Sequence, residues 1–276
     1  MTLTEYPDLE QGSEEWLAAR CGLVTASVVG KLVTSRALGA IEFDCPECGA
    51  LENAPCMSKV RRGGEPGAPI KTLHQSRTDV ARLSGAPPVL EVARGDEAAS
   101  LTALLVAERI TGFVDPVYVN SDMARGQFDE PLARNLYAET YAPVRETGFL
   151  VREEPTWKLG YSPDGLVGDD GLIEVKSPRA KTHLRTILNE EVPSYHMAQI
   201  QAGLLVTGRE WLDFLSYSGG LPMWRKRVYP DQRWFDAIVT AVEQFERTAA
   251  QMIADYEAAV VGLPTTERIL DLEMVI

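Results

Sequence analysis

The chain has 276 residues and a formal net charge of −13, and 45% of its residues are hydrophobic. This length suits one large domain or about two average ones, and the composition is that of a globular protein. No run of about 18 apolar residues occurs, which excludes a membrane-spanning helix, and the acidic balance argues against a passive nucleic-acid coat. The first residues lack a basic segment followed by an apolar one, so we expect no signal peptide and a cytoplasmic location.

The N-terminal part predicts two short helices and then an insertion. Ser13 followed by two glutamates is typical of a capped helix start, and residues 25–32 predict a second helix. Residues 35–88 are rich in Gly, Pro and Cys and poor in periodic apolar residues. We therefore expect a main domain of residues 1–34 and 89–276 with an inserted module of residues 35–88.

The rest of the chain alternates helices and strands. Residues 96–110 and 123–141 have helical patterning, and Pro131 predicts that the second helix is kinked or starts there. Strands are expected at residues 148–152, 157–160, 164–167, 172–176, 211–217 and 223–228, and helices at 181–188, 194–206 and 232–258. The last helix has an apolar stripe typical of a buried face. This order predicts an α/β fold with a mixed central β-sheet flanked by helices.

Three charged residues on a predicted hairpin form a candidate catalytic site. Asp164 lies ten residues before Glu174-x-Lys176, and residues 168–171 form a turn rich in Asp and Gly. Side chains alternate along a strand, so Glu174 and Lys176 share a face, and Asp164 can sit opposite them. Two carboxylates and an ammonium at one point suit a hard divalent cation and phosphodiester hydrolysis. A structural Glu174–Lys176 ion pair is the alternative.

Four residues of the insertion form a candidate zinc site. Cys45, Cys48 and Cys56 lie within a dozen residues, which favours metal ligation over a disulfide in a cytoplasmic chain. His74 would complete a tetrahedral Zn²⁺ site, and four protein ligands leave no open position, so the zinc would be structural. A reduced loop without metal is the alternative. Cys21 is isolated and is expected only to pack.

Two stretches are locally basic and could each form a DNA-binding track or a solvated face. The first stretch holds Lys176, Arg179, Lys181, His183 and Arg185, and the second holds Lys59, Arg61, Arg62, Lys71 and Arg77.

Several motifs together resemble, in the right order, those of a known family. They are Trp16 with Arg20-x-Gly22-x-x-Thr25-Ala26-Ser27, then Arg125-Gly126 with Glu130, Ser162-Pro163-Asp164-Gly165, Glu174-Val175-Lys176, and Tyr195-His196-Met197-Ala198-Gln199-Ile200-Gln201. The set resembles the phage lambda-type 5′→3′ exonucleases, or YqaJ-like viral recombinases, of the PD-(D/E)xK nuclease superfamily. The insertion resembles small zinc-binding modules of actinobacterial phage proteins. The resemblance implies a restriction-endonuclease-like nuclease core.

The resemblance also implies a role for each matched catalytic position. Asp164, Glu174 and the Val175 carbonyl would ligate Mg²⁺ (or Mn²⁺), and Glu130 would help to hold a second ion. Lys176 would orient or deprotonate the attacking water, with its pKa lowered by the nearby metal.

A further set matches the family positions that hold a terminal 5′-phosphate: Arg20, Ser27, Ser162 and Gln199. A guanidinium fork, hydroxyls and an amide suit phosphate oxygens. Read alone, Arg20 and Glu130 could form surface ion pairs, Ser27 could cap a helix, and Gln199 could be solvated. Gln201 faces another side of its helix and is a weaker candidate, and His196 could either approach the site or simply pack.

The implied activity is digestion of linear double-stranded DNA from 5′-phosphorylated ends, which leaves 3′ single strands for phage recombination. Implied partners are DNA ends and a single-strand annealing protein, with a homo-oligomeric ring around DNA and no membrane. A second hypothesis is an endonuclease or a nuclease of other polarity. A third is a zinc-dependent DNA-binding protein with an inactive nuclease site, which the intact set of Asp164, Glu130, Glu174 and Lys176 disfavours.

Overall fold

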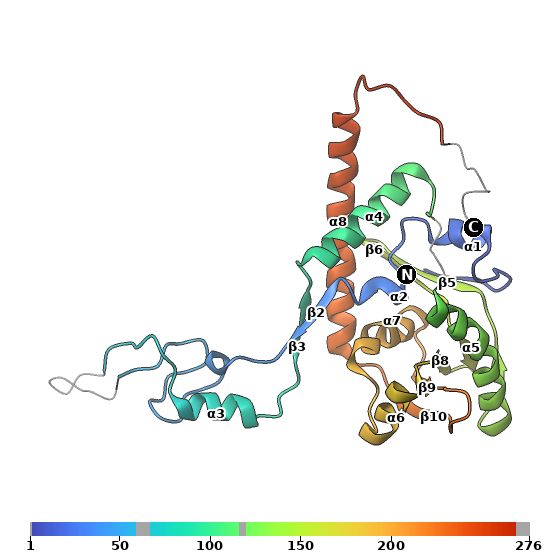
Figure 1. Cartoon of the computed structure of the whole chain (residues 1–276). Helices are drawn as coiled ribbons and strands as arrows, with labels where there is room; N and C mark the ends of the chain where they lie inside the picture. Colours follow the sequence, from blue (N-terminus) through green and yellow to red (C-terminus); the bar gives the residue numbers. More distant parts are fainter. Residues whose placement is uncertain (1, 59–66, 116–119, 269–276) are drawn as a thin grey trace. The chain divides into compact units, whose positions relative to one another are not determined.

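The computed structural model describes residues 2–58, 67–115 and 120–268. The chain divides into two compact units, Met1–Thr34 with Val92–Ile276 and Ser35–Glu91 (Figure 1). We call the first the main unit and the second the zinc unit. The expected insertion, residues 35–88, falls within the zinc unit. None of the helices in the described part of the chain combines the length and the apolarity that crossing a bilayer requires.

The main unit contains two sheets. A three-stranded sheet has the order β1-β5-β6, and a five-stranded sheet has the order β10-β9-β8-β7-β4. In the larger sheet β8 and β9 run parallel while the other pairs are antiparallel, so the expected mixed sheet is confirmed. The strands are β1 (Thr2–Tyr6), β4 (Val144–Arg145), β5 (Phe149–Glu154), β6 (Trp157–Tyr161), β7 (Gly165–Val167), β8 (Gly171–Lys176), β9 (Trp211–Ser216) and β10 (Trp224–Val228). Two further strands, β2 (Val33–Arg36) and β3 (Val89–Val92), pair with each other.

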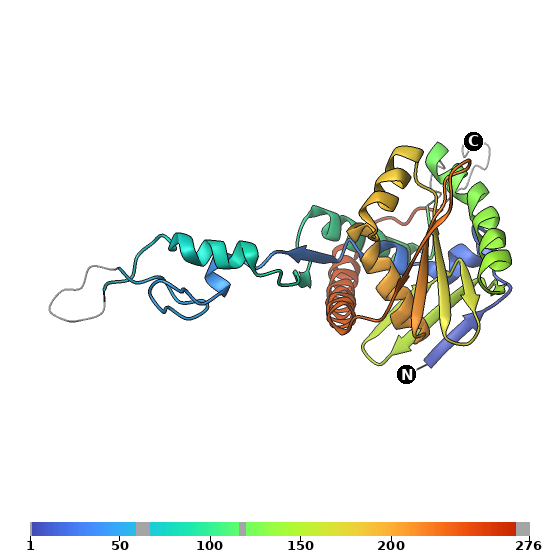
Figure 2. The same ribbon diagram turned by 90° about the horizontal axis from the view of Figure 1, so that it is seen from below.

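Helices cover both faces of the larger sheet. The helices of the main unit are α1 (Glu14–Arg20), α2 (Ala26–Val29), α4 (Asp96–Thr111), α5 (Ser121–Thr140), α6 (Ala180–Asn189), α7 (Met197–Thr207) and α8 (Gln232–Ala259), with a short 3-10 helix at Ser194–His196. Figure 2 shows α5 on one side of this sheet and α6 and α7 on the other. The expected α/β fold with a sheet flanked by helices is therefore confirmed.

The helix that carries Glu130 begins well before its proline. Asn120 caps α5 by accepting hydrogen bonds from the backbone N–H groups of Asp122 and Met123. The alternative that the helix starts at Pro131 is therefore wrong, because Pro131 lies inside one continuous helix. Proline removes one intrahelical donor, which the rest of a long helix can tolerate.

Packing on the two faces of β8 decides where its charged side chains point. On one face, Ile173 and Val175 are buried against Ala133 and Tyr137 of α5. Because side chains alternate, Glu174 points to the opposite face, where α7 packs against β6 and β9. Close packing of α7 against β6 requires a glycine at position 203, since a Cβ there would lie 2.7 Å from the Tyr161 ring.

Candidate functional site

The hairpin β7–β8 brings the predicted catalytic residues together. Its register pairs Val167 with Gly171. Lys176 Nζ lies 2.7 Å from Glu174 Oε1, and the Val175 N–H donates to Asp164 Oδ2 at 2.6 Å. The ion pair expected as the alternative is thus present, and Asp164 lies beside it.

The Glu174 carboxylate is held from three sides. Its side chain is 1% exposed, and besides Lys176 it accepts hydrogen bonds from Tyr161 Oη at 3.2 Å and Gln199 Nε2 at 2.6 Å. Gln199 is therefore not a solvated helix residue. A buried carboxylate with several donors is fixed in orientation, as a metal ligand needs to be.

Glu130 approaches the same place from α5 and is anchored by a residue that sequence reasoning missed. Arg134 forms ion pairs with Glu130 and Glu146, and its Nε donates to the Asp164 carbonyl oxygen at 2.8 Å. The i, i+4 spacing of opposite charges on a helix was the available signal for this pair. Arg134 therefore links Glu130 to the loop that carries Asp164.

The crowding of carboxylates makes the site attractive to cations. Burial raises the pKa of Asp164 well above its usual range, and the negative charges of Glu174 and Glu130 raise it further. Burial also raises the pKa of Glu130. Burial lowers the pKa of Lys176, but Glu174 and Asp164 outweigh that effect, so its pKa is raised. Hard oxygen donors with excess negative charge fit a divalent cation such as Mg²⁺ or Mn²⁺.

A cavity of about 570 Å³ joins these residues to the predicted phosphate-binding set. Its lining includes every main-unit residue that the sequence predicts for the site: Arg20, Ser27, Glu130, Ser162, Asp164, Glu174, Val175, Lys176 and Gln199. The residues come from α1, α2, α5, α7 and the β7–β8 hairpin, and the tertiary structure brings them together.

Arg20 is desolvated, and its interactions are with an aromatic ring and with hydroxyl groups. Its guanidinium carbon lies 3.8 Å from the centre of the Trp16 ring, and one terminal nitrogen donates to Thr25 Oγ1 at 3.3 Å and Ser27 Oγ at 3.4 Å. Burial lowers the pKa of Arg20 to about 10. Arg20 forms no ion pair with another described residue, so the expected alternative of a surface ion pair is wrong. The cap of α2 is Thr25, not Ser27.

The other candidates near the site are structural. Gln201 is fully buried and bonds to the backbone of Tyr229 and Asp231. His196 does not line the cavity but packs against Phe214, and burial lowers its pKa to about 4.

The basic stretch that follows Lys176 contains one residue that is not at the surface. His183 is fully buried, with its ring nitrogens at 2.8 Å from Ser216 Oγ and 3.0 Å from the Pro222 carbonyl oxygen. The expectation of a surface role for His183 is therefore wrong, whereas Arg179, Lys181 and Arg185 are exposed.

The zinc unit brings the predicted zinc ligands together. The ligand atoms of Cys45, Cys48, Cys56 and His74 all lie within 4.8 Å of one another. A hydrogen bond from the Met57 N–H is the main cause that lowers the pKa of Cys48 to about 6, which favours its thiolate. Three thiols and one imidazole at this separation fit a tetrahedral zinc ion.

His74 is oriented for this purpose by an acidic neighbour. Its Nδ1 lies 3.4 Å from the Cys45 sulfur, and its Nε2 lies 3.5 Å from Glu47 Oε1. A carboxylate at the far nitrogen fixes the ring of a metal-binding histidine and raises its basicity. Sequence reasoning missed Glu47, which lies between the first two cysteines.

Arg77 holds the zinc unit together instead of facing DNA. Its side chain is fully buried and donates to the backbone carbonyl groups of Ile41, Phe43, Leu51 and Ala54 at 2.7–2.9 Å. The expectation that Arg77 belongs to a basic surface is wrong, because the loops wrap around its guanidinium. Lys59, Arg61 and Arg62 of the same stretch lie outside the described residues.

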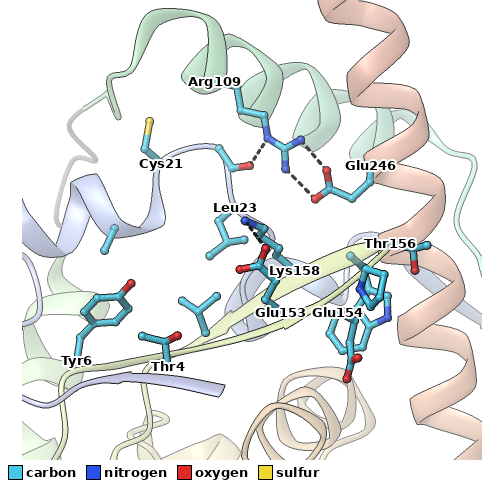
Figure 3. A pocket seen from close by; sticks show the side chains of 15 residues that line it. Thr4, Tyr6, Cys21, Leu23, Arg109, Glu153, Glu154, Thr156, Lys158 and Glu246 are labelled. Carbon is cyan, nitrogen blue, oxygen red and sulfur yellow. Dashed lines mark hydrogen bonds and ion pairs between the residues drawn. The ribbon is translucent and has the colours of Figure 1, made fainter. Parts of the chain in front are cut away.

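A second cavity of the main unit, of about 560 Å³, has charged residues that pair with each other (Figure 3). Arg109 forms two hydrogen bonds with Glu246, at 2.7 and 2.8 Å, and Lys158 pairs with Glu153 at 2.8 Å. Cys21 lines it and donates to the Glu108 carbonyl oxygen at 3.3 Å, so it packs as expected. No predicted catalytic residue lines this cavity.

Two family models and two solved structures of one exonuclease are similar to this chain. Residues 74–210 match the family described as the YqaJ-like viral recombinase domain, and residues 11–95 match the family described as "Putative DNA-binding phage zinc finger domain". The crystal structure of an alkaline exonuclease (LHK-Exo) from Laribacter hongkongensis is 29% identical, with a TM-score of 0.61, over 91% of this chain and 100% of that chain. The structure of LHK-Exo in complex with dAMP matches with the same identity, coverage and TM-score.

No curated protein sequence matches the chain at a significant level. The family matches and the structural likeness nevertheless point the same way as the shared cavity and the cysteine cluster. The chain is therefore similar to YqaJ-like viral recombinase domains over residues 74–210 and to phage zinc finger domains over residues 11–95.

Proposed function

We propose that this chain is a metal-dependent exonuclease that digests linear double-stranded DNA from 5′-phosphorylated ends and leaves 3′ single strands for phage recombination. The observation that carries the proposal is the single cavity lined both by the carboxylates with Lys176 and by Arg20 with its hydroxyl neighbours. The likeness to an alkaline exonuclease over 91% of the chain supports the same reaction class.

The acidic residues of the cavity would hold the cations. Asp164, Glu174 and the Val175 carbonyl would bind one Mg²⁺ ion and Glu130 would help to bind a second, and such ions activate water and stabilise the leaving oxygen. Lys176 has its ammonium beside Glu174 and would orient the attacking water. Cation binding would relieve the negative charge that raises the pKa of Lys176, and the lower pKa would populate the neutral amine, which can accept a proton from water.

The other end of the cavity would select a terminal phosphate. A phosphate monoester carries more negative charge than an internal diester, about −1.5 to −2 at neutral pH. Arg20 supplies a desolvated positive charge there, and Ser27 and Ser162 supply hydroxyl groups. Gln199 uses one amide hydrogen on Glu174 and keeps a second one for a phosphate oxygen. An internal phosphate would gain less from this set, so cleavage would depend on ends.

The proposal also includes a structural role for zinc, a partner protein and a homo-oligomer. The Cys/His cluster would hold a structural zinc ion, and the zinc unit would extend the DNA-binding track or recruit a partner. We propose a single-strand annealing protein as the partner that takes over the 3′ strand. A homo-oligomeric ring would let an acidic protein keep a basic bore around DNA.

The direct test uses purified protein with Mg²⁺ and linear duplex DNA that is 5′-phosphorylated and labelled at one end, beside closed circular DNA. Progressive loss from the 5′ end, with the circle intact and the Lys176→Ala variant inactive, is the expected result. Cutting of the circle would instead identify an endonuclease. Binding without any cleavage, with Mg²⁺ or with Mn²⁺, would refute the nuclease proposal.

A further inference from the structure

One buried aromatic side chain touches two members of the proposed phosphate-binding set. The Trp16 ring is 8% exposed and stacks on the Arg20 guanidinium at 3.8 Å. Its indole Nε1–H donates to Ser162 Oγ at 3.0 Å, across 146 positions of sequence. Trp16 thus ties α1 to the loop that precedes the catalytic hairpin, at the place where both line the cavity.

The hydrogen bonds around Trp16 determine which hydrogens remain for a ligand. An indole N–H can only donate, so Ser162 must accept from it, and the Ser162 hydroxyl hydrogen remains available. This hydrogen has no acceptor among the described residues. Arg20 likewise donates to the hydroxyls of Thr25 and Ser27. These two oxygens lie 3.0 Å apart and share one of their two hydroxyl hydrogens, so the other hydrogen remains available.

No carboxylate among the described residues contacts the Arg20 guanidinium directly. Burial lowers its pKa to about 10 against the opposing effect of the Glu108 charge, and its direct contacts among the described residues are the rings of Trp16 and Phe149 and two hydroxyls. Stacking uses the face of a guanidinium and not its edge, which is the part that forms a bidentate contact with phosphate. In Arg20 one terminal nitrogen donates to the two hydroxyls, and Nε and the other terminal nitrogen have no acceptor among the described residues. The stack on Trp16 therefore presents Arg20 in the form that an anionic ligand needs.

We infer that Trp16 is a positioning residue for end recognition, which fixes both the Arg20 guanidinium and the Ser162 hydroxyl so that the cavity prefers a terminal phosphate over a terminal hydroxyl. This inference rests on the proposed exonuclease function. Trp16 contacts the phosphate-binding groups and not the reacting atoms, so it acts on binding and selectivity. Its loss raises KM for phosphorylated ends more than it lowers kcat.

The test compares Trp16→Leu, Trp16→Phe and Arg20→Ala with the wild-type protein. For each, the kcat/KM on duplex DNA with 5′-phosphate ends is divided by that on 5′-hydroxyl ends. Arg20→Ala abolishes this preference, and Trp16→Leu lowers it by about tenfold or more, the size of one lost charge-assisted hydrogen bond. Trp16→Phe keeps an aromatic ring under Arg20 but loses the donor to Ser162, so its ratio lies between those of wild type and Trp16→Leu.

A matched control separates positioning from general loss of packing. Trp157 is 7% exposed and has the Arg152 guanidinium 5.5 Å from its ring centre, but it does not line the site cavity. Trp157→Leu is expected to leave the phosphate preference unchanged. Fluorescence anisotropy of labelled duplex ends in EDTA measures binding without cleavage. It gives, for each variant, the ratio of the affinities for 5′-phosphate and 5′-hydroxyl ends. If Trp16→Leu does not fold, Trp16→Phe tests the inference by both the kcat/KM ratio and the affinity ratio.

The outcomes distinguish this inference from the proposed function. If Arg20→Ala abolishes the preference while both Trp16 variants keep the wild-type ratio, the positioning role is refuted and the exonuclease proposal stands. If the wild-type protein degrades both kinds of end equally, or degrades neither, the end-recognition pocket itself is wrong and the Trp16 inference fails with it.

Discussion

Replacing Arg77 by methionine should destabilise the zinc unit more than any other single exchange on its helix, α3 (Gln75–Leu83). Methionine is similar in length and apolar, so it fills much of the same space but donates no hydrogen bond. Four backbone carbonyl groups then lose the donor that holds the surrounding loops together. The contact from Arg77 to the Cys56 sulfur, at 3.5 Å, is lost as well.

The size of the effect follows from those bonds. The carbonyl groups of Phe43 and Ala54 are left without a donor among the described residues, which costs about 1–3 kcal/mol each. Those of Ile41 and Leu51 keep a backbone N–H donor and lose one hydrogen bond, about 0.5–1.5 kcal/mol each, so the lower values together give about 3 kcal/mol. A core this small rarely supplies more than about 3–5 kcal/mol, so the loss is comparable with the whole stability apart from metal. Zinc binding is coupled to folding of such a unit. At about 1.4 kcal/mol per factor of ten, the apparent zinc affinity should fall by about a hundredfold.

Zinc affinity is measured by competition with a chromogenic chelator on the full-length protein. Arg82→Met is the matched control, because Arg82 lies on the same helix with its side chain 72% exposed and ion-paired with Asp79. The control should bind zinc within a few-fold of the wild type, as expected for a surface pair. An Arg77→Met variant whose affinity stays within about tenfold of the wild type would refute the reasoning.

Three further predictions concern single side chains. Lys176→Ala should slow DNA cleavage by about 10²–10⁴-fold, the range for a lost acid–base group, while DNA affinity changes little. Glu47→Gln should weaken zinc binding by about 10–100-fold, because the carboxylate orients His74, and chelator competition measures this. Burial alone would raise the pKa of Asp213, but hydrogen bonds from Arg227 and its other partners lower it. Asp213→Asn should therefore cost about 3 kcal/mol of unfolding free energy at neutral pH.

The Asp213 prediction has a defined pH dependence. Because the folded pKa lies below the unfolded value of about 3.9, the stabilisation is present above that value and is lost as the pH falls through the folded pKa. The difference between wild type and Asp213→Asn in denaturant unfolding should stay constant from neutral pH to about pH 5 and shrink below about pH 4. A difference that grows on acidification would contradict this.

For Lys176→Ala, cleavage within tenfold of the wild type would count against a role for the ammonium.

Local patterns in the sequence were sufficient for the hairpin, the grouping of three cysteines with His74, and most helices. The period of two in a strand places Glu174 and Lys176 on one face, and the turn between residues 167 and 171 sets their distance from Asp164. The spacing of Cys45, Cys48 and Cys56 similarly indicated a metal cluster. Strands β1, β2, β3 and β4 were missed, because none has more than five residues and β1 is exposed along its whole length.

Contacts between distant segments decided the rest, and no local pattern encodes them. The sequence by itself, through ordered motifs, determined which residues are candidates to meet a phosphate, but only the tertiary structure joined Trp16 to Ser162 and Arg134 to the Asp164 carbonyl oxygen. Arg77 shows the same limit, since its charge predicts a solvated residue whereas the fold buries it. The physical reason is that a guanidinium can be buried wherever enough carbonyl oxygens converge on it, and that convergence is a property of folded loops and not of sequence spacing.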